Sequence, residues 1–420
     1  MTQMNGVNPR LQTNAVAAIV TATISASGVC ANEADTPDFA FNGFGTLGLV
    51  HSSEKQADFT SSFLKPDGAG HSDGWNEDVD SLLGAQVTAN LTSQLVAVVQ
   101  VIAEENYDYT YRPHIEWANI KYEFTPDFSV RFGRTVLPTA LLSDTRKVGY
   151  TYPWVRPPQE TYRLVPLTNS DGVDVSYRLH AGELTNTVQV GVGRHDADLP
   201  HNGGTLETRD LRVISNITEF GAFTGHIAYL RAHATLLELN RAVFDVFRQF
   251  GPQGVAIADK YSLNDTTVSM ISFGAEYDPG HWFVTGEWGR VESRSFIGGT
   301  AWHASGGYRF GQLMPYMTYA RATGANLSDP GLDVSTLPPF LAEPALALNA
   351  GLNSILSSNS VQTTVSLGGR WDFIRNGSLK LQFDHIRMGA GSTGVLTNTQ
   401  PGFQLGGQVN IFSATFDFVF

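Results

Sequence analysis

The fold of this chain is decided by its carboxyl-terminal stretch, Ile411-Phe412-Ser413-Ala414-Thr415-Phe416-Asp417-Phe418-Val419-Phe420. Aromatic side chains stand at positions 412, 416, 418 and 420, and the polar Ser413, Thr415 and Asp417 stand between them. Because successive side chains of a β-strand point to opposite faces, this pattern predicts a strand with one apolar and one polar face. The apolar face requires a nonpolar surrounding, whereas the polar face requires water or polar partners.

The same period of two recurs along the chain after Pro37. Between residues 83 and 91, apolar side chains at odd positions alternate with Gln86, Thr88 and Asn90. Comparable stretches occur at 39–50, 95–103, 118–124, 128–132, 173–179, 188–192, 211–213, 271–277, 282–288, 302–310, 314–321, 361–373 and 379–383. Together with the terminal stretch, and a strand flanked by His226 and His233, they predict an all-β fold of about sixteen strands.

The links between these stretches alternate in length. Short links such as 125–127, 278–280 and 375–377 contain the proline, glycine and asparagine residues of tight turns. Long links run over residues 51–76, 137–168, 236–264 and 323–358, and apolar residues have helical spacing at 239–250 and 344–356. Short turns at one end and long external loops at the other are typical of a transmembrane antiparallel β-barrel.

The composition permits a membrane barrel, although its averages resemble those of a soluble protein. Hydrophobic residues make up 42 % and the mean hydropathy is -0.11, because polar residues that face a lumen offset the apolar residues that face lipid. After the amino-terminal segment, no run of about 18 apolar residues occurs, so no helix is predicted to span a membrane. The second face of the strands carries many charged residues, and unpaired charges in a packed interior cost several kcal/mol each. We therefore expect a closed barrel with a water-filled lumen.

The amino-terminal segment, residues 1–31, resembles a secretory signal peptide. Arg10 supplies the positive charge, 15–29 is apolar, and small residues precede the expected cleavage after Ala31. The alternatives are a lipoprotein signal that uses Cys30 and a short buried helix. Cleavage leaves a single domain, the barrel of residues 32–420, without cysteine, because the sequence contains only this one.

Two segments resemble parts of outer-membrane proteins. The terminal stretch resembles the β-signal that the barrel-assembly machinery reads, although Thr415 stands where that signal often has glycine. The segment from Phe132-Gly133-Arg134 through Tyr152-Pro153-Trp154 to Asp171-Gly172-Val173-Asp174 is similar to a stretch of many porin-like proteobacterial proteins. The arrangement as a whole resembles the general Gram-negative porins. This resemblance implies location in the cell outer membrane, a homotrimer, and passage of small hydrophilic solutes and ions.

In that family the third loop folds into the barrel and forms the pore constriction. Its equivalent here is 137–168, between the fifth and sixth strands, where five prolines limit flexibility. We expect the constriction charges in this loop to be Asp144, Arg146, Lys147, Arg156, Glu160 and Arg163. We expect the pore wall opposite to present Lys121, Arg131, Arg134, Arg178, Arg309, Arg321 and Arg370, with Arg212 as a further inward arginine. The basic residues slightly outnumber the inward acids, which favours anions; for each charge, an ion pair or a solvated position is the alternative.

The sequence shows no pattern typical of a catalytic, metal or cofactor site. The eleven histidines are scattered without paired metal spacing, and the net charge of -13 argues against nucleic-acid binding. We therefore expect a passive channel rather than an enzyme, in contact with outer-membrane lipid and lipopolysaccharide. The alternatives are a channel selective for a sugar, an organic acid or an anion, an outer-membrane barrel enzyme, and a secreted soluble β-protein.

Overall fold

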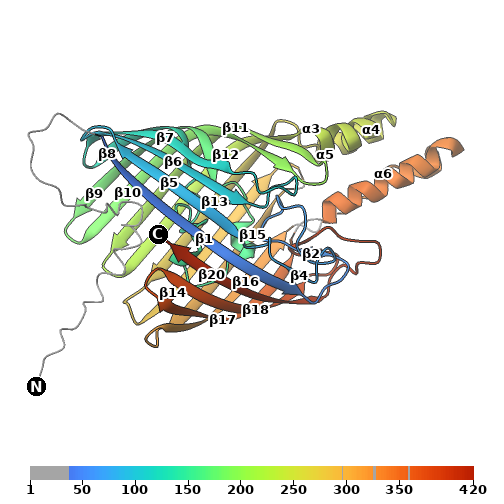
Figure 1. Cartoon of the computed structure of the whole chain (residues 1–420). Helices are drawn as coiled ribbons and strands as arrows, with labels where there is room; N and C mark the ends of the chain where they lie inside the picture. The colour runs from blue at the N-terminus through green and yellow to red at the C-terminus, as the bar shows by residue number, and fades with distance from the viewer. Residues whose placement is uncertain (1–36, 296, 325–327, 358–359) are drawn as a thin grey trace, which may run out of the picture.

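The computed structural model describes residues 37–295, 297–324, 328–357 and 360–420, which form a β-barrel closed on itself (Figure 1). The expected signal peptide lies outside the described residues. Each wall strand pairs antiparallel with the next one along the chain, and the first strand also pairs with the last, which closes the barrel. No helix in the described part of the chain has the length and hydropathy needed to cross a membrane.

Sixteen strands form the wall, and a two-residue strand, β4 (Trp75–Asn76), extends the sheet to seventeen. The wall strands are β1 (Asp38–Ser52), β5 (Leu82–Asn90), β6 (Leu95–Glu104), β7 (His114–Thr125), β8 (Phe128–Val136), β9 (Asn169–Ala181), β10 (Leu184–Leu199), β11 (Gly204–Phe220), β12 (Phe223–Leu236), β13 (Thr266–Tyr277), β14 (Trp282–Ser293), β15 (Gly299–Tyr308), β16 (Leu313–Gly324), β17 (Gln362–Ile374), β18 (Gly377–Met388) and β20 (Gln408–Val419). The links contain β2 (Asp58–Phe59), β3 (Ala69–Gly70), β19 (Leu396–Thr397), η1 (Gly149–Thr151), α2 (Gln159–Tyr162), α3 (Leu237–Leu239), η2 (Asn240–Phe244), α4 (Asp245–Arg248), α5 (Gly251–Tyr261), η3 (Val334–Thr336) and α6 (Pro339–Ser357). The prediction of an antiparallel barrel of sixteen strands is confirmed.

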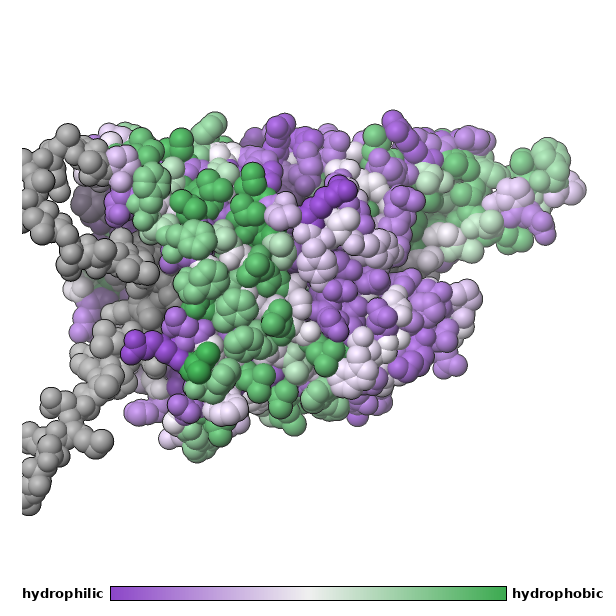
Figure 2. Space-filling model, in the orientation of Figure 1, coloured by the Kyte–Doolittle hydropathy of each residue, from purple (hydrophilic) through white to green (hydrophobic). Residues whose placement is uncertain are grey.

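The outer surface of the barrel is apolar around its middle. Phe39, Phe41 and Leu47 of β1 are 66 %, 59 % and 61 % exposed, and Phe132 of β8 is 68 % exposed. Figure 2 shows a broad apolar area over the strands and mostly hydrophilic residues toward the end that carries the long loops. Because exposed apolar area costs about 25 cal/mol per Å² in water, this surface is suited to a lipid surrounding.

The links alternate in length as predicted, so the barrel has a turn end and a loop end. At the turn end, strands are joined by two-residue links such as 182–183 and 221–222. At the loop end, α4, α5 and α6 project beyond the wall (Figure 1) and share an apolar cluster around Phe247 and Leu352. The two segments with helical spacing are therefore helical, and their apolar residues pack within the loops.

Gly133 of β8 has a backbone conformation that predicts a clear effect of substitution. Its φ is +124°, and a Cβ atom there would lie 2.3 Å from the carbonyl oxygen of Ala118 on β7. We expect Gly133→Ala to lower the free energy of unfolding by about 1–3 kcal/mol, because backbone strain and the close contact both oppose the methyl group. Urea titration of the barrel in detergent micelles, followed by tryptophan fluorescence, measures the change. Gly369→Ala is the control, since no atom lies within 4 Å of its Cβ position; equal effects of the two substitutions contradict the prediction.

Candidate functional site

The loop of residues 137–168 joins the fifth and sixth wall strands, β8 and β9, as predicted, and it lies inside the barrel. On one side, Ser272 Oγ of β13 donates a hydrogen bond to the carbonyl oxygen of Thr139 (2.7 Å). On another side, Lys147 forms an ion pair with Glu104 of β6. Because its partners are inward-facing residues on different parts of the wall, the loop crosses the lumen. We call this segment the inner loop.

Trp154 anchors the middle of the inner loop to the wall. Its side chain is 4 % exposed, and its indole N–H donates to Ser305 Oγ of β15 (2.8 Å) and Thr318 Oγ1 of β16 (3.0 Å). The ring belongs to an apolar cluster with Tyr152, Phe283, Met314 and Tyr316. A buried tryptophan stabilises the packing through its large apolar area, and the hydrogen bonds of its N–H fix the orientation of the ring. This part of the loop therefore has one defined position.

Lys380 of β18 holds the same part of the inner loop from the wall. Its side chain is fully buried; the ammonium forms an ion pair with Asp417 of β20 (3.0 Å) and donates to the carbonyl oxygens of Gly149 (2.6 Å) and Trp154 (2.8 Å). These contacts use all three donors of the lysine. A Cβ atom at Gly149 would lie 2.1 Å from Asp417 Oδ1, so a larger residue there would displace the carboxylate of the pair.

Arg156 joins three separate parts of the chain. Its guanidinium makes a two-pronged pair with Asp80 (2.8 and 2.6 Å), which belongs to the first external loop, residues 53–81 between β1 and β5. It also lies 3.5 Å from Asp384 of β18 and donates to Ser413 Oγ of β20 (2.7 Å). The arginine is 5 % exposed, and both carboxylates are buried as well. Paired charges in this geometry tie the inner loop to the wall and to the external surface.

The charges expected at the constriction divide into two groups. Besides Arg156, Glu160 is buried and accepts hydrogen bonds from two residues of β17, and Arg163 donates to a main-chain carbonyl between β18 and β20 (2.7 Å). Arg146 donates to the carbonyl oxygen of Tyr162 within the loop (2.7 Å). These four side chains hold the inner loop in place. Lys147, paired with Glu104 of β6, also contacts the wall, so Asp144 alone forms the second group.

The second group faces a charged part of the inner wall. Asp144 is exposed and lies within electrostatic reach of Arg131 and Asp174, which form an ion pair across β8 and β9 (2.9 Å). Directly opposite Arg131 in the strand register is Lys121 of β7, which is paired with Glu123. Asp144 therefore faces a part of the wall where acidic and basic side chains are paired with one another.

The other residues expected on the pore wall have different positions. Arg178 alternates with outward-facing neighbours on β9, so it faces inward, and it is exposed. Arg370 faces inward but is nearly buried, donating to the carbonyl oxygen of Tyr150 in the inner loop (2.7 Å). Arg309 lies in a link at the turn end, paired with Asp278 (2.6 Å).

Three arginines expected on the inner wall lie on the outer face instead, which corrects that expectation. Arg134 occupies the next outward position after the exposed Phe132, and Arg321 follows Tyr319 in the same way. Arg212 is also outward and exposed. The expectation assumed that an arginine in a membrane strand must face a water-filled lumen. Beyond the hydrocarbon layer, however, headgroups and water also solvate the outer face.

Lys380 and Asp80 are not among the site residues that the sequence predicts. The signal for Lys380 was available, because it stands between the outward Leu379 and Leu381 and so must face inward. Asp80 lies in a loop without any periodic pattern, and only the folded chain brings it to Arg156.

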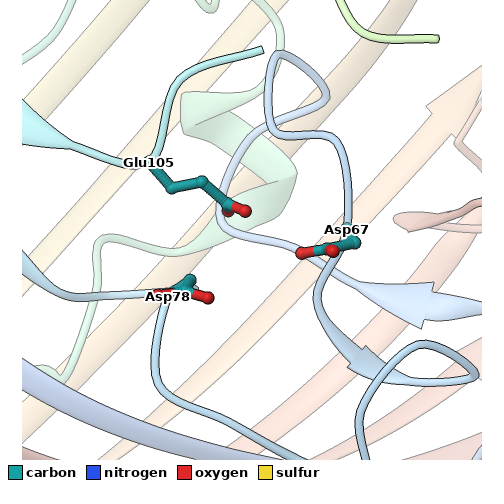
Figure 3. Close-up of side chains that lie close together, drawn as sticks. All are labelled: Asp67, Asp78 and Glu105. Carbon is teal, nitrogen blue, oxygen red and sulfur yellow. The ribbon is translucent and has the colours of Figure 1, made fainter. Parts of the chain in front are cut away.

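Three carboxylates lie close together where the first external loop meets the second, residues 105–113 between β6 and β7. Oxygen atoms of Asp67, Asp78 and Glu105 lie within 4.8 Å of one another (Figure 3). Carboxylate oxygens are ligands for hard cations such as Ca²⁺. Burial, together with the neighbouring charge of Asp67, raises the pKa of Glu105 to about 8. At neutral pH a proton on Glu105 therefore relieves the repulsion within the cluster.

Comparison with known proteins places the fold. The barrel superposes on the anion-selective porin from Comamonas acidovorans with a TM-score of 0.54 and 12 % identity, covering 92 % of this chain and 100 % of that one. It is also similar to OmpF of Salmonella typhi in complex with daunomycin, with a TM-score of 0.53 and 12 % identity. This match covers 90 % of this chain and 97 % of that one. A third similar structure is the outer membrane channel DcaP of Acinetobacter baumannii. Its TM-score is 0.52 at 13 % identity, and the match covers 91 % of this chain and 97 % of that one. No family model and no curated protein matches the sequence.

Proposed function

We propose that this chain, which has the fold of the outer-membrane porins, forms a water-filled channel for passive diffusion of small hydrophilic solutes and ions across the outer membrane of a Gram-negative bacterium. The observation that supports this most is a charged, partly exposed strip inside a closed barrel whose outside is apolar. Asp144, Lys121 and Arg131 form this strip. Hydrated ions pass along linings of this kind. An apolar outer surface of this extent is unfavourable in water and favourable in a membrane.

We further propose a homotrimer that is inserted by the barrel-assembly machinery. One arc of the wall, made of β20, β1, β5, β6 and β7, contains no arginine and exposes apolar residues such as Leu49, Leu83 and Ile115. The remaining arc carries outward arginines at the loop end. An apolar outer face without arginine suits contact with a second copy of the chain.

Single-channel recording in a planar bilayer tests the proposed channel. We expect discrete conductance steps from the purified protein, and a protein that inserts without any conductance overturns the proposal. A substrate-selective channel is the second candidate, supported by the many anchors that restrict the space around the inner loop. In that case one solute class, a sugar, an organic acid or an anion, blocks the ion current at low concentration. We propose a channel in preference to a barrel enzyme.

Arg178 offers a test of charge selectivity, because its side chain has no ion pair in the described part of the chain. A unit charge about 10 Å from an ion in water changes the energy of that ion by about 0.4 kcal/mol. Arg178→Glu changes the charge by two units, with opposite sign for anions and cations, so we expect the anion-to-cation permeability ratio to fall by about tenfold at low salt. Reversal potentials in a salt gradient measure this ratio. Asp144→Asn is expected to shift the potential toward anions, and unchanged potentials in both variants contradict the assigned lining.

A further inference from the structure

The outward arginines share one level on the barrel. The strands β8, β10, β12, β14 and β16 all run toward the loop end. On each of them, the last apolar residue of the outer face is followed, two positions later, by an arginine on the same face. The arginines at this level are Arg134, Arg194, Arg212, Arg231, Arg290, Arg321 and Arg387. Six of them are exposed, and Arg134 is partly exposed. We call these seven residues the arginine girdle.

The girdle lies only at the loop end. The outward positions of the wall strands near the turn end contain no lysine or arginine in the described residues. The chain as a whole is acidic, with a net charge of -13, so the girdle does not reflect a generally basic surface. An excess of arginine at one edge of the apolar surface suits a surrounding layer that is negative on that side.

Two girdle arginines are paired with carboxylates, Arg134 with Asp171 and Arg290 with Glu292, whereas four others are not paired within the described residues. Arg212 and Arg231 are directly opposite in the register of β11 and β12. Arg321 and Arg387 both pair in register with Thr363, one from each side. None of these four arginines has a carboxylate within 4 Å in the described part of the chain. Like charges directly opposite destabilise a sheet, so an anion bound between Arg212 and Arg231 stabilises this arrangement.

The chemistry of the side chains identifies the anion. All seven residues are arginine, whose planar guanidinium binds phosphate with two parallel hydrogen bonds, and none is lysine. Their position next to the aromatic or aliphatic border is that of lipid headgroups. We propose that the arginine girdle, centred on Arg212 and Arg231, binds the phosphate groups of a bisphosphorylated glycolipid, the lipopolysaccharide of the outer leaflet. The assignment of the leaflet rests on the proposed function.

Binding of purified lipids to the detergent-solubilised full chain tests this assignment. The probes are bisphosphorylated lipid A, dephosphorylated lipid A and phosphatidylglycerol, and native mass spectrometry measures the affinity of each. We expect the double variant Arg212→Gln/Arg231→Gln to bind bisphosphorylated lipid A about 25-fold more weakly, at about fivefold for each arginine removed. The control Arg241→Gln/Arg375→Gln removes two exposed arginines outside the girdle, and we expect it to bind like the unmodified chain.

Three outcomes overturn the proposal. The first is equal affinity of the girdle variant and the unmodified chain. The second is undiminished binding of dephosphorylated lipid A, and the third is equally tight binding of phosphatidylglycerol, which indicates a surface for any anionic lipid. Conductance of the girdle variant in a zwitterionic bilayer is recorded in parallel. Loss of lipid A binding with normal conductance supports the proposed lipid site. Absence of conductance in the unmodified chain and in every variant contradicts the proposed channel but not the lipid site.

Discussion

Lys380→Met is expected to lower the free energy of unfolding by about 3–5 kcal/mol, because it leaves the buried carboxylate of Asp417 without its cation. Lys380 and Asp417 are both fully buried, so water cannot replace the lost charge. The carbonyl oxygens of Gly149 and Trp154 lose their donor at the same time. We expect the inner loop to detach from this part of the wall, and the current through a single channel to become noisier.

Two measurements check this prediction. Urea titration in detergent micelles gives the change in the free energy of unfolding, and current variance in a planar bilayer gives the change in loop motion. The control is Lys260→Met, which breaks an ion pair with Asp329 whose lysine is 62 % exposed, and which we expect to cost no more than about 1 kcal/mol. The double variant Lys380→Met/Asp417→Asn removes both charges and is expected to recover most of the loss. Similar stabilities of the Lys380 and Lys260 variants contradict the role of the buried pair.

Arg156→Met is expected to have an effect of similar size, about 3–5 kcal/mol, because two buried carboxylates depend on this arginine. Without it, Asp80 keeps no cation within 4 Å in the described residues, and neither does Asp384. Since Asp80 belongs to the first external loop, we expect that loop to separate from the inner loop and to become sensitive to protease. Limited proteolysis of the folded protein, together with urea titration, measures both effects.

Arg156→Lys is the matched variant for this prediction. It keeps the positive charge but loses the two-pronged contact with Asp80, so we expect an intermediate stability. If the lysine variant is as unstable as the methionine variant, the geometry of the guanidinium matters more than its charge. If both variants are as stable as the unmodified chain, the contacts of Arg156 with Asp80, Asp384 and Ser413 do not hold the inner loop.

The outward arginines were predicted wrongly because their charge was given more weight than the alternation of the strand. Alternation places Arg134 on the same face as Phe132, and this face is the outer one. The expectation of an inward position came from the charge of the residue rather than from the alternation. Arg134 stands at the border of the apolar outer surface, however, and a long arginine side chain at such a border reaches headgroups and water. Charge alone therefore does not distinguish the lumen from the headgroup region.

The sequence by itself determined the class of fold. A period of two is a local property of each strand, and the alternation of short and long links is visible along the chain, so the barrel, its strand number and the position of the inner loop between β8 and β9 follow from local patterns. Only the tertiary structure decided how the inner loop is held. The partners of Arg156 are 76, 228 and 257 residues away, and no local pattern relates side chains across such separations. Closure of the barrel brings them together, because β20 pairs with β1 and thereby places the end of the chain beside its beginning.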